Sequence, residues 1–466
     1  MKKIKQLLTM AVIVFAIMIC SSMSAFALTE GEWEFKLLDN EVTITKYLGN
    51  GGDVVVPETI AGCPVTNIED QNYKNRAGDV FEDVDITTLE IKAKIKQLNQ
   101  ALAYKQKNLK KVILPDGIES IGDSAFYGCE SLVTINIPSS VKKIGAQTFA
   151  ECTSLKTLSL PAGIETIGHK IFSFSGITEI DLSNVKATLN TRRGDVRMFE
   201  FCKNLKRVVL SPNVERVGDE MFLGCTALEE VVIPNGVKII GERAFEDCTS
   251  LKNIVLPTTL TDILGNAFYN TGLKEVVVPY GTKYITSSFK NCQNLEAVYI
   301  PDTVDLMYFN PIYLSPNAII YCSEGSYAAQ YCKEEGISYL TDNSVNSGIH
   351  VYYNGKRISF HSYAQNPEIL EGRTLVPLRS IFEAMGAVVD WDGATSTAIA
   401  KRGNIEVRIT IGANAIYKNG EAIPVDVPAR LMNGRTMVPA RVIAEAFGAD
   451  VQWNGNGRAV LISESR

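Results

Sequence analysis

One pattern of apolar and polar positions recurs along most of the chain. Stretches of the form L-x-x-V-x-I-P, such as LEEVVIP at 228–234, place apolar residues at alternating positions and end in proline. Alternation with a period of two is typical of a short strand with one buried face, and proline ends the strand because it has no N–H to donate. In most repeats V-x-x-I-G and then A-F follow, which supply two further apolar groups.

The repeats are 22 or 23 residues long, with one exception. Their leading apolar residues are Leu109, Leu132, Leu155, Ile177, Leu205, Leu228, Leu251, Leu273 and Leu295. The one 28-residue step, from Ile177 to Leu205, contains NVKATLNTRRGD, which we interpret as a loop insertion near Arg192. A degenerate repeat at 86–108 precedes the regular ones.

A single repeat cannot bury its own apolar edge, so the repeats are expected to stack as coils of a solenoid with strands ~4.8 Å apart. We predict that the Phe of each repeat is buried. We predict parallel strands at 109–114, 132–137, 155–160, 205–210, 228–233, 251–256, 273–278 and 295–300.

These repeats resemble the BspA-like leucine-rich repeats of bacterial surface antigens. The segment WEFKLLDNEVTITKYLGNGGDVVVPETIAGCPVTNI resembles the N-terminal coil of that family, and AIIYCSEGSYAAQYCKEEGISYL resembles its terminal strand–helix–strand cap. The resemblance covers residues 33 to about 340. It implies a leucine-rich-repeat solenoid of parallel stacked coils at 28–340 and a binding role at a bacterial surface.

The pattern changes after a polar stretch at 341–349, which we expect to be a linker. EGRTLVPLRSIFEAMGAVVDWDG at 371–393 returns as NGRTMVPARVIAEAFGADVQWNG at 433–455. Each copy predicts a strand, a helix with Pro377 or Pro439 in its first turn, and a second strand that ends at a glycine turn. We therefore expect a small α+β domain with an internal duplication at 350–466.

GRTLVPLR, GRTMVPAR and the G-A-x-V-x-W tails resemble the copper amine oxidase N-terminal-like domain. That domain is a non-catalytic stalk in the amine oxidases, so the resemblance implies a wall-associating or spacer role. Arg379 and Arg441, just inside the two helices, are candidate contacts to an anionic wall polymer; solvated surface or an intradomain salt bridge is the alternative. Trp391 and Trp453 could stack on sugars, but we interpret them as core residues, because Trp at the end of a short strand is more often buried.

The first 27 residues have the pattern of a secretory signal peptide. MKKIK is a basic start, LLTMAVIVFAIMIC is an apolar run, and SAFA supplies small residues for cleavage after Ala27. We expect a secreted chain, associated with the cell surface or cell wall. No later segment approaches the ~20 apolar residues of a membrane span, so the mature chain has no predicted transmembrane segment. Cys20 as a lipid-attachment cysteine is the alternative, although Ile19 stands where lipoprotein signals have a small residue.

Charge is distributed unevenly along the chain. Residues 28–349 have 30 basic and 41 acidic side chains, which argues against nucleic acid as a partner because nucleic-acid binding needs a basic surface. Residues 350–466 have 13 basic and 11 acidic side chains, an excess too small to predict a partner. We expect a monomer that binds protein or polysaccharide at the cell surface.

The sequence lacks the arrangements that carry common catalytic chemistry. Its three histidines, His169, His350 and His361, form no H-E-x-x-H motif or other metal-binding spacing, and C-x-x-C, G-x-S-x-G and P-loop motifs do not occur. We therefore predict no catalytic residue, no cofactor and no metal, and a protein that is not an enzyme.

Cysteine recurs at one position of the repeat, three residues after the repeat Phe. The members of this set are Cys129, Cys152, Cys202, Cys225, Cys248 and Cys292. Two other repeats have Ser175 and Thr271 there, and neither could replace a disulfide partner or a metal ligand. We interpret the position as packing. Export permits disulfides, and Cys322 with Cys332 is the better candidate pair.

Two functions remain open: an adhesion or binding protein that recognises a macromolecule on the concave face of the solenoid, and a structural spacer without a specific ligand. Within L-x-x-V-x-I, the residue between the last two inward positions points outward. In the second half of the solenoid these residues are Val209, Val232, Val255, Val277 and Tyr299, flanked by Arg207, Glu230 and Glu275. We predict an apolar stripe that contacts a partner, because exposed apolar stripes often mark contact surfaces. The β-propensity of valine is the alternative explanation.

Overall fold

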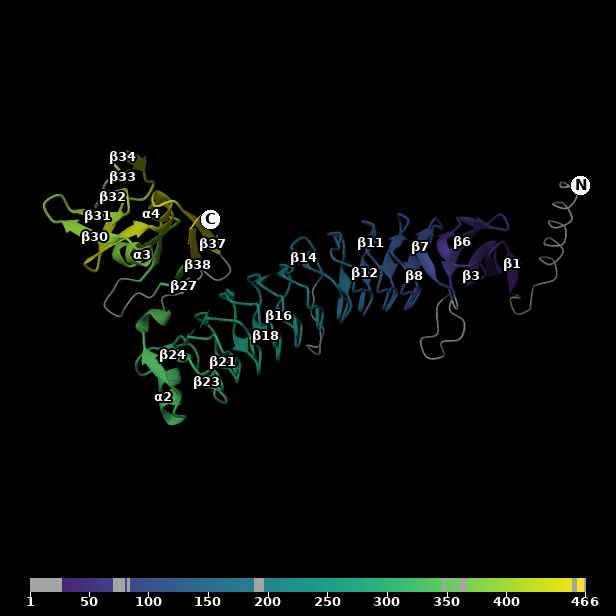
Figure 1. Cartoon of the computed structure of the whole chain (residues 1–466), viewed down its shortest axis with the longest axis horizontal. Helices are drawn as coiled ribbons and strands as arrows, with labels where there is room; N and C mark the ends of the chain where they lie inside the picture. Colours follow the sequence, from purple (N-terminus) through teal and green to yellow (C-terminus); the bar gives the residue numbers. More distant parts are fainter. Residues whose placement is uncertain are drawn as a thin grey trace, which may run out of the picture.

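The computed structural model describes residues 27–69, 80–81, 84–187, 197–346, 349–354, 356–358, 360, 366–454 and 459–464. These residues form a long solenoid with a smaller domain at its C-terminal end (Figure 1). The signal peptide up to residue 26 and the insertion near Arg192 lie outside the described residues, so both stay predictions. Within the described ranges, no helix has the length and apolar character needed to cross a membrane.

A five-stranded sheet covers the N-terminal end of the solenoid, with strand order β1-β2-β3-β6-β5. Its strands are β1 (Leu28–Glu30), β2 (Trp33–Leu38), β3 (Glu41–Tyr47), β5 (Thr59–Ile60) and β6 (Cys63–Ile68). The rings of Trp33 and Tyr47 pack with centroids 4.9 Å apart and are both buried. The sheet thereby shields the apolar edge of the first coil, as a terminal cap of a repeat protein must.

One side of the solenoid carries the strands that begin each coil, and we call it the first-strand face. Its first run of parallel strands is β4 (Gly52–Val56), β7 (Ile86–Ile91), β9 (Lys111–Ile113) and β11 (Thr134–Ile135). The second run is β14 (Glu179–Asp181), β15 (Arg207–Val209) and β17 (Glu230–Val232). The third run is β20 (Glu275–Val277), β22 (Ala297–Tyr299), β24 (Ile319–Cys322) and β25 (Tyr339–Thr341).

The predicted strands at 155–160 and 251–256 are absent, and their absence separates the three runs. Both coils are one residue shorter than the 23-residue repeat and end in a glycine. A Cβ on Gly176 would lie 2.0 Å from the Thr153 carbonyl oxygen, and one on Gly272 would lie 2.3 Å from that of Thr249, so only glycine fits. The coil at 273–294 is also 22 residues long but keeps β20, so the feature shared by the two coils without a strand is their final glycine.

A second parallel ladder comes from the V-x-x-I segment of each coil and consists of two-residue strands. Its first run is β8 (Gln97–Leu98), β10 (Ser120–Ile121), β12 (Lys143–Ile144) and β13 (Thr166–Ile167). Its second run is β16 (Arg216–Val217), β18 (Ile239–Ile240), β19 (Asp262–Ile263), β21 (Tyr284–Ile285) and β23 (Leu306–Met307). In nearly every pair, the inner residue of each strand is buried and stands opposite its counterpart in the next coil, as Ile240 does opposite Ile263.

The interior of the solenoid contains a continuous column of phenylalanine rings. The column consists of Phe126, Phe149, Phe172, Phe199, Phe222, Phe245, Phe268 and Phe289, each fully buried. Neighbouring ring centroids are 5.1 to 6.0 Å apart and the ring planes differ by 3 to 13°. The prediction that each repeat Phe is buried is confirmed for these coils.

The C-terminal cap has the predicted strand–helix–strand order, with α2 (Tyr327–Glu334) between β24 and β25. The Ser326 hydroxyl accepts a hydrogen bond from the Ala329 N–H at 3.2 Å, which caps the start of α2. Ala328, Ala329 and Cys332 are the buried residues of the helix. The predicted linker begins inside β25, because Thr341 still pairs with Cys322.

The described residues of the C-terminal domain form three sheets and two short helices. The first sheet contains β26 (His350–Tyr353), β27 (Lys356–Arg357), β37 (Ala449–Asn454) and β38 (Ala459–Glu464). The second contains β28 (Glu368–Leu370), β29 (Arg373–Pro377), β35 (Arg430–Met432) and β36 (Arg435–Pro439). The third contains β30 (Val388–Asp392), β31 (Thr397–Arg402), β32 (Ile405–Thr410), β33 (Ala415–Lys418) and β34 (Glu421–Pro424), and the helices are α3 (Leu378–Ala384) and α4 (Ala440–Ala446).

The internal duplication predicted for this domain is present. β29, α3 and β30 correspond to β36, α4 and β37 in order, and β29 pairs antiparallel with β36. Pro377 and Pro439 occupy the N-cap positions, one residue before the predicted first turn. Phe382 of α3 and Phe447 after α4 meet edge to face with centroids 5.2 Å apart, so the two copies share one core.

The phenylalanine column predicts a large cost for truncation of one ring. Phe149→Ala and Phe245→Ala should each lower the free energy of unfolding by ~3–5 kcal/mol, because a buried ring is replaced by a cavity. Phe174→Ala is the matched control: this residue is 48% exposed and stacks only on Phe201, so a loss of ~1 kcal/mol or less is expected. Equilibrium urea denaturation measures all three; losses below ~1 kcal/mol for both column variants would contradict the role of the rings.

Candidate functional site

Part of the predicted stripe on the first-strand face lies where the sequence placed it. Val209, Val232 and Val255 are half-buried, and Val209 stands opposite Val232 in the parallel ladder. Beside them, the Arg207 Nε donates to the Glu230 Oε2 at 3.0 Å, and both side chains are exposed. The three valines therefore form a short apolar stripe next to an exposed ion pair.

The prediction of exposure is wrong for Val277 and Tyr299, the remaining members of the stripe. They are 7% and 6% exposed, and they pack with Ala297 and Val345 in an apolar cluster separate from the solenoid core. Val345 belongs to the stretch predicted to be a linker, which forms a short helical turn, η1 (Asn343–Asn346). The alternation of side chains along the strand correctly predicted that Val277 and Tyr299 point away from the solenoid core. They are buried because a later segment of the same chain, around Val345, covers them.

The start of the C-terminal domain completes this cover. The Arg357 guanidinium carbon lies 4.2 Å from the centroid of the Tyr299 ring, and the Arg357 backbone N–H donates to the Glu275 Oε1. Glu275 is therefore also engaged within the chain, contrary to the predicted partner contact. Tyr352 packs against the same cluster, and burial raises the pKa of its hydroxyl.

Asn346 fixes the linker from the other side. Its Nδ2 donates to Asp302 Oδ2 at 2.8 Å and to Ser323 Oγ at 2.9 Å, while its Oδ1 accepts from the Asp302 N–H at 2.9 Å. These bonds join the linker to the last coils. Figure 1 accordingly shows the C-terminal domain beside the last coils rather than in line with the rod.

Arg379 and Arg441 are both on the surface of the C-terminal domain, as predicted. Each side chain is 62% exposed and has a carboxylate oxygen one helical turn away at 3.9 Å, from Glu383 and Glu445 respectively. Exposed pairs of this length contribute little to stability. Both guanidinium groups thus remain accessible to a ligand.

Trp391 and Trp453 are 44% and 42% exposed, so their interpretation as core residues is wrong. β30 and β37, which carry them, are the edge strands of their sheets. An edge strand has a neighbour on one side only, which leaves the side chains near its end uncovered.

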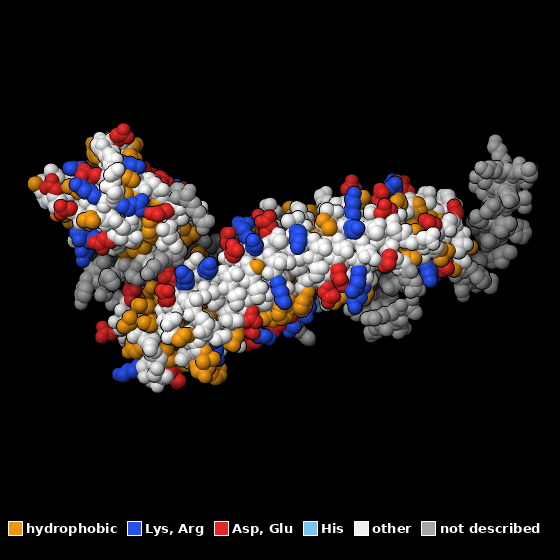
Figure 2. All heavy atoms as spheres, viewed as in Figure 1, with side chains coloured by type: hydrophobic (Ala, Val, Ile, Leu, Met, Phe, Trp, Pro, Cys, Tyr) orange, Lys and Arg blue, Asp and Glu red, His pale blue; other side chains and the backbone are white. Residues whose placement is uncertain are grey.

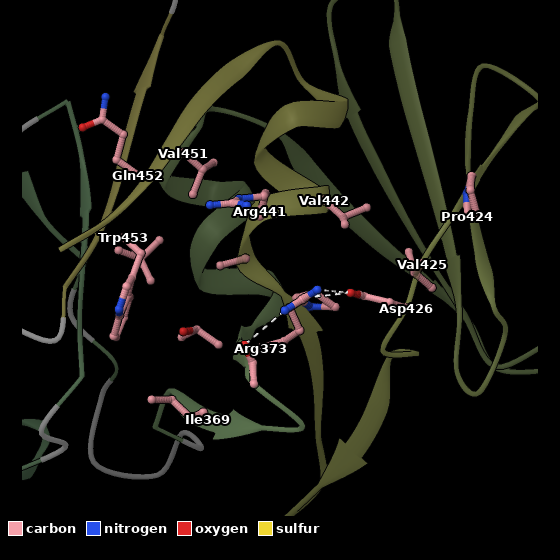
Figure 3. A pocket seen from close by; sticks show the side chains of 15 residues that line it. Ile369, Arg373, Pro424, Val425, Asp426, Arg441, Val442, Val451, Gln452 and Trp453 are labelled. Atoms are coloured by element: carbon pink, nitrogen blue, oxygen red, sulfur yellow. Dashed lines mark hydrogen bonds and ion pairs between the residues drawn. The ribbon is translucent and has the colours of Figure 1, made fainter. Parts of the chain in front are cut away.

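A cavity of about 780 Å³ in the C-terminal domain brings Trp453 and Arg441 together (Figure 3). The hairpin of β28 and β29 contributes Arg373, and the end of β34 is followed by Asp426. Neither Trp391 nor Arg379 lines this cavity. Sequence reasoning considered Trp453 and Arg441 separately and missed the cavity, because Asp426 lies outside the duplicated motif.

A second surface that the sequence did not indicate lies on the last coils. Phe309 is 71% exposed and Tyr313 is 54% exposed, and the Lys290 Nζ lies 5.9 Å from the centroid of each ring. Figure 2 shows hydrophobic side chains gathered near this end of the rod, whereas basic and acidic side chains are interspersed along the rest of the visible face.

The six repeat cysteines are buried free thiols that donate to the coil before them. Cys225 Sγ lies 3.0 Å from the Phe199 carbonyl oxygen and Cys248 Sγ lies 3.2 Å from that of Phe222. Thr271, at the same position, donates its hydroxyl to the Phe268 carbonyl oxygen at 3.1 Å. The residue at this position therefore fills space in the core, as interpreted, and is in addition a small hydrogen-bond donor.

Cys322 and Cys332 are also buried free thiols, so the disulfide considered for this pair is not formed in the structure. Burial raises the pKa of Cys322 to about 11 and that of Cys332 to about 12. Among the described residues, no group of three or more His, Cys, Asp or Glu side chains is arranged to hold a metal ion.

The thiols predict a selective reaction in the native protein. Cys63 is half-buried, whereas the other eight described cysteines are buried with raised pKa values and little thiolate at pH 8. An aromatic disulfide reagent should react with one thiol per native mature chain and release one equivalent of its aromatic thiol. The Cys63→Ser variant should show no such release. Rapid reaction of three or more thiols before denaturation would contradict the burial of the cysteine column.

The docked linker predicts a change of shape when its anchor is lost. Val345→Asp should separate the C-terminal domain from the last coils, because transfer of a carboxylate from water into this apolar cluster costs free energy. Small-angle X-ray scattering should record a larger radius of gyration than for the unaltered chain. Val388→Asp, at a position that is 75% exposed, should leave it unchanged. Identical scattering from both variants would show that Val345 does not hold the domains together.

Comparisons with known proteins agree with this architecture. The model of the BspA type leucine rich repeat region matches residues 74–192 and 195–314 in six copies, and that of the copper amine oxidase N-terminal domain matches residues 352–462. A leucine-rich repeat protein from Bacteroides ovatus shares the fold, with a TM-score of 0.50 and 20% identity over 70% of this chain and 82% of that one.

A leucine rich cell surface protein from Faecalibacterium prausnitzii gives a TM-score of 0.38 and 22% identity over 68% of this chain and 99% of that one. The pneumococcal vaccine antigen PcpA gives a TM-score of 0.42 and 16% identity over 69% of this chain and 100% of that one. No curated protein matches the chain. Since the repeat model covers more than half of the sequence, the chain belongs to the family of BspA type leucine-rich repeat proteins and carries a copper amine oxidase N-terminal domain after the repeats.

Proposed function

We propose that this chain is an exported binding protein of the bacterial envelope, without catalytic activity of its own. The first-strand face would bind a segment of a partner protein, and the C-terminal domain would associate with the envelope. The signal-peptide pattern of residues 1–27 supports export. The absence from the sequence of the usual nucleophile and metal motifs supports a non-catalytic role.

One observation carries the binding role: two strands of the first-strand face have the same sequence but differ in what covers them. β17 and β20 both read Glu-Val-Val. On β20, Val277 packs against Val345, and Glu275 accepts the backbone N–H of Arg357. The outward positions of β20 therefore hold another stretch of polypeptide through one apolar contact and one carboxylate.

The same two groups on β17 are open. Glu230 is exposed and Val232 is half-buried, and Val209 and Val255 extend the apolar surface to the neighbouring coils. A partner segment with an apolar side chain and a free backbone N–H could occupy them as the linker occupies β20. Glu230 would exchange its ion pair with Arg207 for the new contact, at little cost because exposed pairs are weak.

A structural spacer is the second candidate, and the junction favours it. Asn346 and Arg357 fix the C-terminal domain to the last coils through bonds to Asp302, Ser323 and Glu275. A fixed junction transmits orientation from one domain to the other, which suits a protein that holds something at a set distance from the envelope.

Binding to immobilised mature chain separates the two candidates. Envelope extracts and host matrix proteins are passed over the unaltered chain, Val232→Lys/Val255→Lys and Ser159→Lys. Ser159 occupies the same outward position on an earlier coil and is already exposed, so its variant adds the charge without removing apolar surface. We expect a partner retained by the unaltered chain and by Ser159→Lys but lost from the double variant.

Equal retention by all three proteins would refute the proposed binding surface. Retention of nothing by any of them would favour the spacer. Circular dichroism should show the same unfolding temperature for the three proteins, because all the altered side chains point away from the core.

A further inference from the structure

The cavity in the C-terminal domain is a formed pocket with contributions from both halves of the duplication. Its volume of about 780 Å³ lies within the range of ~300–1,000 Å³ common for small-ligand sites. Part of the lining is apolar, with Val425, Ala440 and Val460 all buried. Arg373, Asp426, Arg441 and Trp453 add polar and aromatic side chains to it (Figure 3). An apolar base with a few polar groups is typical of a binding site.

Trp453 forms one wall and is available to a ligand. Its exposed fraction of 42% is large for a tryptophan, and the neighbouring Gln452 is exposed as well. The face of an indole ring is electron-rich, so it attracts groups with a partial positive charge on hydrogen. The C–H face of a pyranose ring is such a group, whereas its hydroxyl edge requires hydrogen-bond donors and acceptors.

Arg373 and Asp426, elsewhere in the lining, supply such donors and acceptors. Arg373 binds Asp426 through Nε at 2.7 Å and through Nη2 at 2.5 Å, both to the Oδ2 atom. The Asp426 side chain is 51% exposed, so its carboxylate is accessible to a ligand hydroxyl. The hydrogen bond from Arg373 lowers the pKa of Asp426, which keeps the carboxylate ionised and able to accept.

The charge of the cavity is positive by one unit. Arg373 is balanced by Asp426, whereas the closest carboxylate of Arg441 is Glu445 on the next helical turn at 3.9 Å, with both side chains exposed. A pair of this length in solvent is weak and can be displaced by a better-placed anion. Arginine binds carboxylates through two parallel N–H bonds, which makes a carboxylate on the ligand the natural complement.

We propose that this cavity binds a carboxylate-bearing saccharide, with the pyranose ring stacked on Trp453, its hydroxyls on Asp426 and Gln452, and its carboxylate on Arg441. The inference rests on the proposed envelope association for its biological setting, but the binding step can be tested apart from it. Two sources carry this chemistry: the N-acetylmuramic acid of wall glycan from which the stem peptide has been removed, and the uronic acids of capsules or host matrix.

The duplication provides matched controls within the same domain. Trp391 has the same place in the first copy and nearly the same exposure as Trp453, and Arg379 has the same exposure and the same 3.9 Å ion pair as Arg441. Neither lines the cavity. A non-specific effect of losing an exposed aromatic ring or a surface charge should therefore appear equally in both copies.

Isothermal titration calorimetry on the mature chain tests the inference with three probes. These are the N-acetylglucosamine–N-acetylmuramic acid disaccharide, its neutral counterpart chitobiose, and a glucuronate-containing hyaluronan tetrasaccharide. We expect the unaltered chain to bind at least one acidic probe more tightly than chitobiose. Which acidic probe binds better distinguishes wall from matrix as the source.

The variants then locate the site. Trp453→Ala should weaken binding of the preferred acidic probe by about ten-fold or more, while Trp391→Ala leaves it unchanged. Arg441→Ala should remove the preference for the acidic probe over chitobiose, while Arg379→Ala retains it. Unchanged unfolding temperatures of the four variants show that the fold is intact.

The inference is overturned if the unaltered chain binds none of the three probes, or if Trp391→Ala and Trp453→Ala weaken binding equally. Co-sedimentation with isolated envelopes separates this outcome from the fate of the proposed function. Envelope binding that survives Trp453→Ala rejects the cavity as the site but leaves envelope association standing. Saccharide binding in solution without any co-sedimentation supports the cavity and rejects envelope association.

Discussion

The architecture depends on the contact between the phenylalanine rings of successive coils. Each ring between Phe126 and Phe289 stacks on the rings before and after it, 5.1 to 6.0 Å away, so no coil can bury its own ring alone. The spacing of the rings sets the spacing of the coils, and the two parallel ladders follow in register. Because a stack of this kind always has two open ends, the N-terminal sheet around Trp33 and the helix α2 are needed to cover them.

The tight corner that brings each Phe inward is held by the coil beside it. Ser124, Gln147 and Glu220 have positive φ angles of 54, 55 and 56°, a region that costs a non-glycine residue about 1–2 kcal/mol. Their N–H groups donate to carbonyls of the next coil at 2.8, 2.9 and 2.9 Å. The buried cysteine thiols donate to the coil before, as Cys152 does to the Phe126 carbonyl oxygen at 3.2 Å. The strain of one coil is thus compensated by its neighbours, which makes stability a property of the stack.

The sequence predicts what depends on the repeat and misses what depends on contacts between distant segments. The repeat period was enough to predict the solenoid and the buried Phe positions. The family resemblance predicted the caps, and the separate recurrence of 371–393 at 433–455 predicted the duplicated C-terminal motif. The sequence did not predict the missing strands at 155–160 and 251–256, because both segments keep the apolar pattern of the other coils. It placed Val277 on the correct face, but Val345, which covers it, is separated from it by several elements of the chain.

In the C-terminal domain, too, the sequence motif did not predict contacts with distant segments. Trp391 and Trp453 have equivalent motifs, and the motif alone suggests equivalent surroundings. The difference between them comes from Asp426, which is 53 residues from its partner Arg373 and outside both copies of the motif. Since that segment helps to form a cavity that is lined by Trp453 but not by Trp391, the cavity was not visible in either motif taken separately.

Repetition followed by unequal covering is therefore the common principle of both parts of the chain. β17 and β20 present the same Glu-Val-Val sequence, but the linker occupies only β20. Trp391 and Trp453 are nearly equally exposed, but Trp453 lines the described cavity and Trp391 does not. β20 is occupied by the linker, whereas β17 is free to bind a partner. Trp391 lies on the surface outside the cavity, whereas Trp453 lines it. In both pairs, one copy can bind a ligand without any change to the fold. Candidate sites in such a protein are best sought where equivalent residues have different neighbours, because the repeat itself accounts for everything that the copies share.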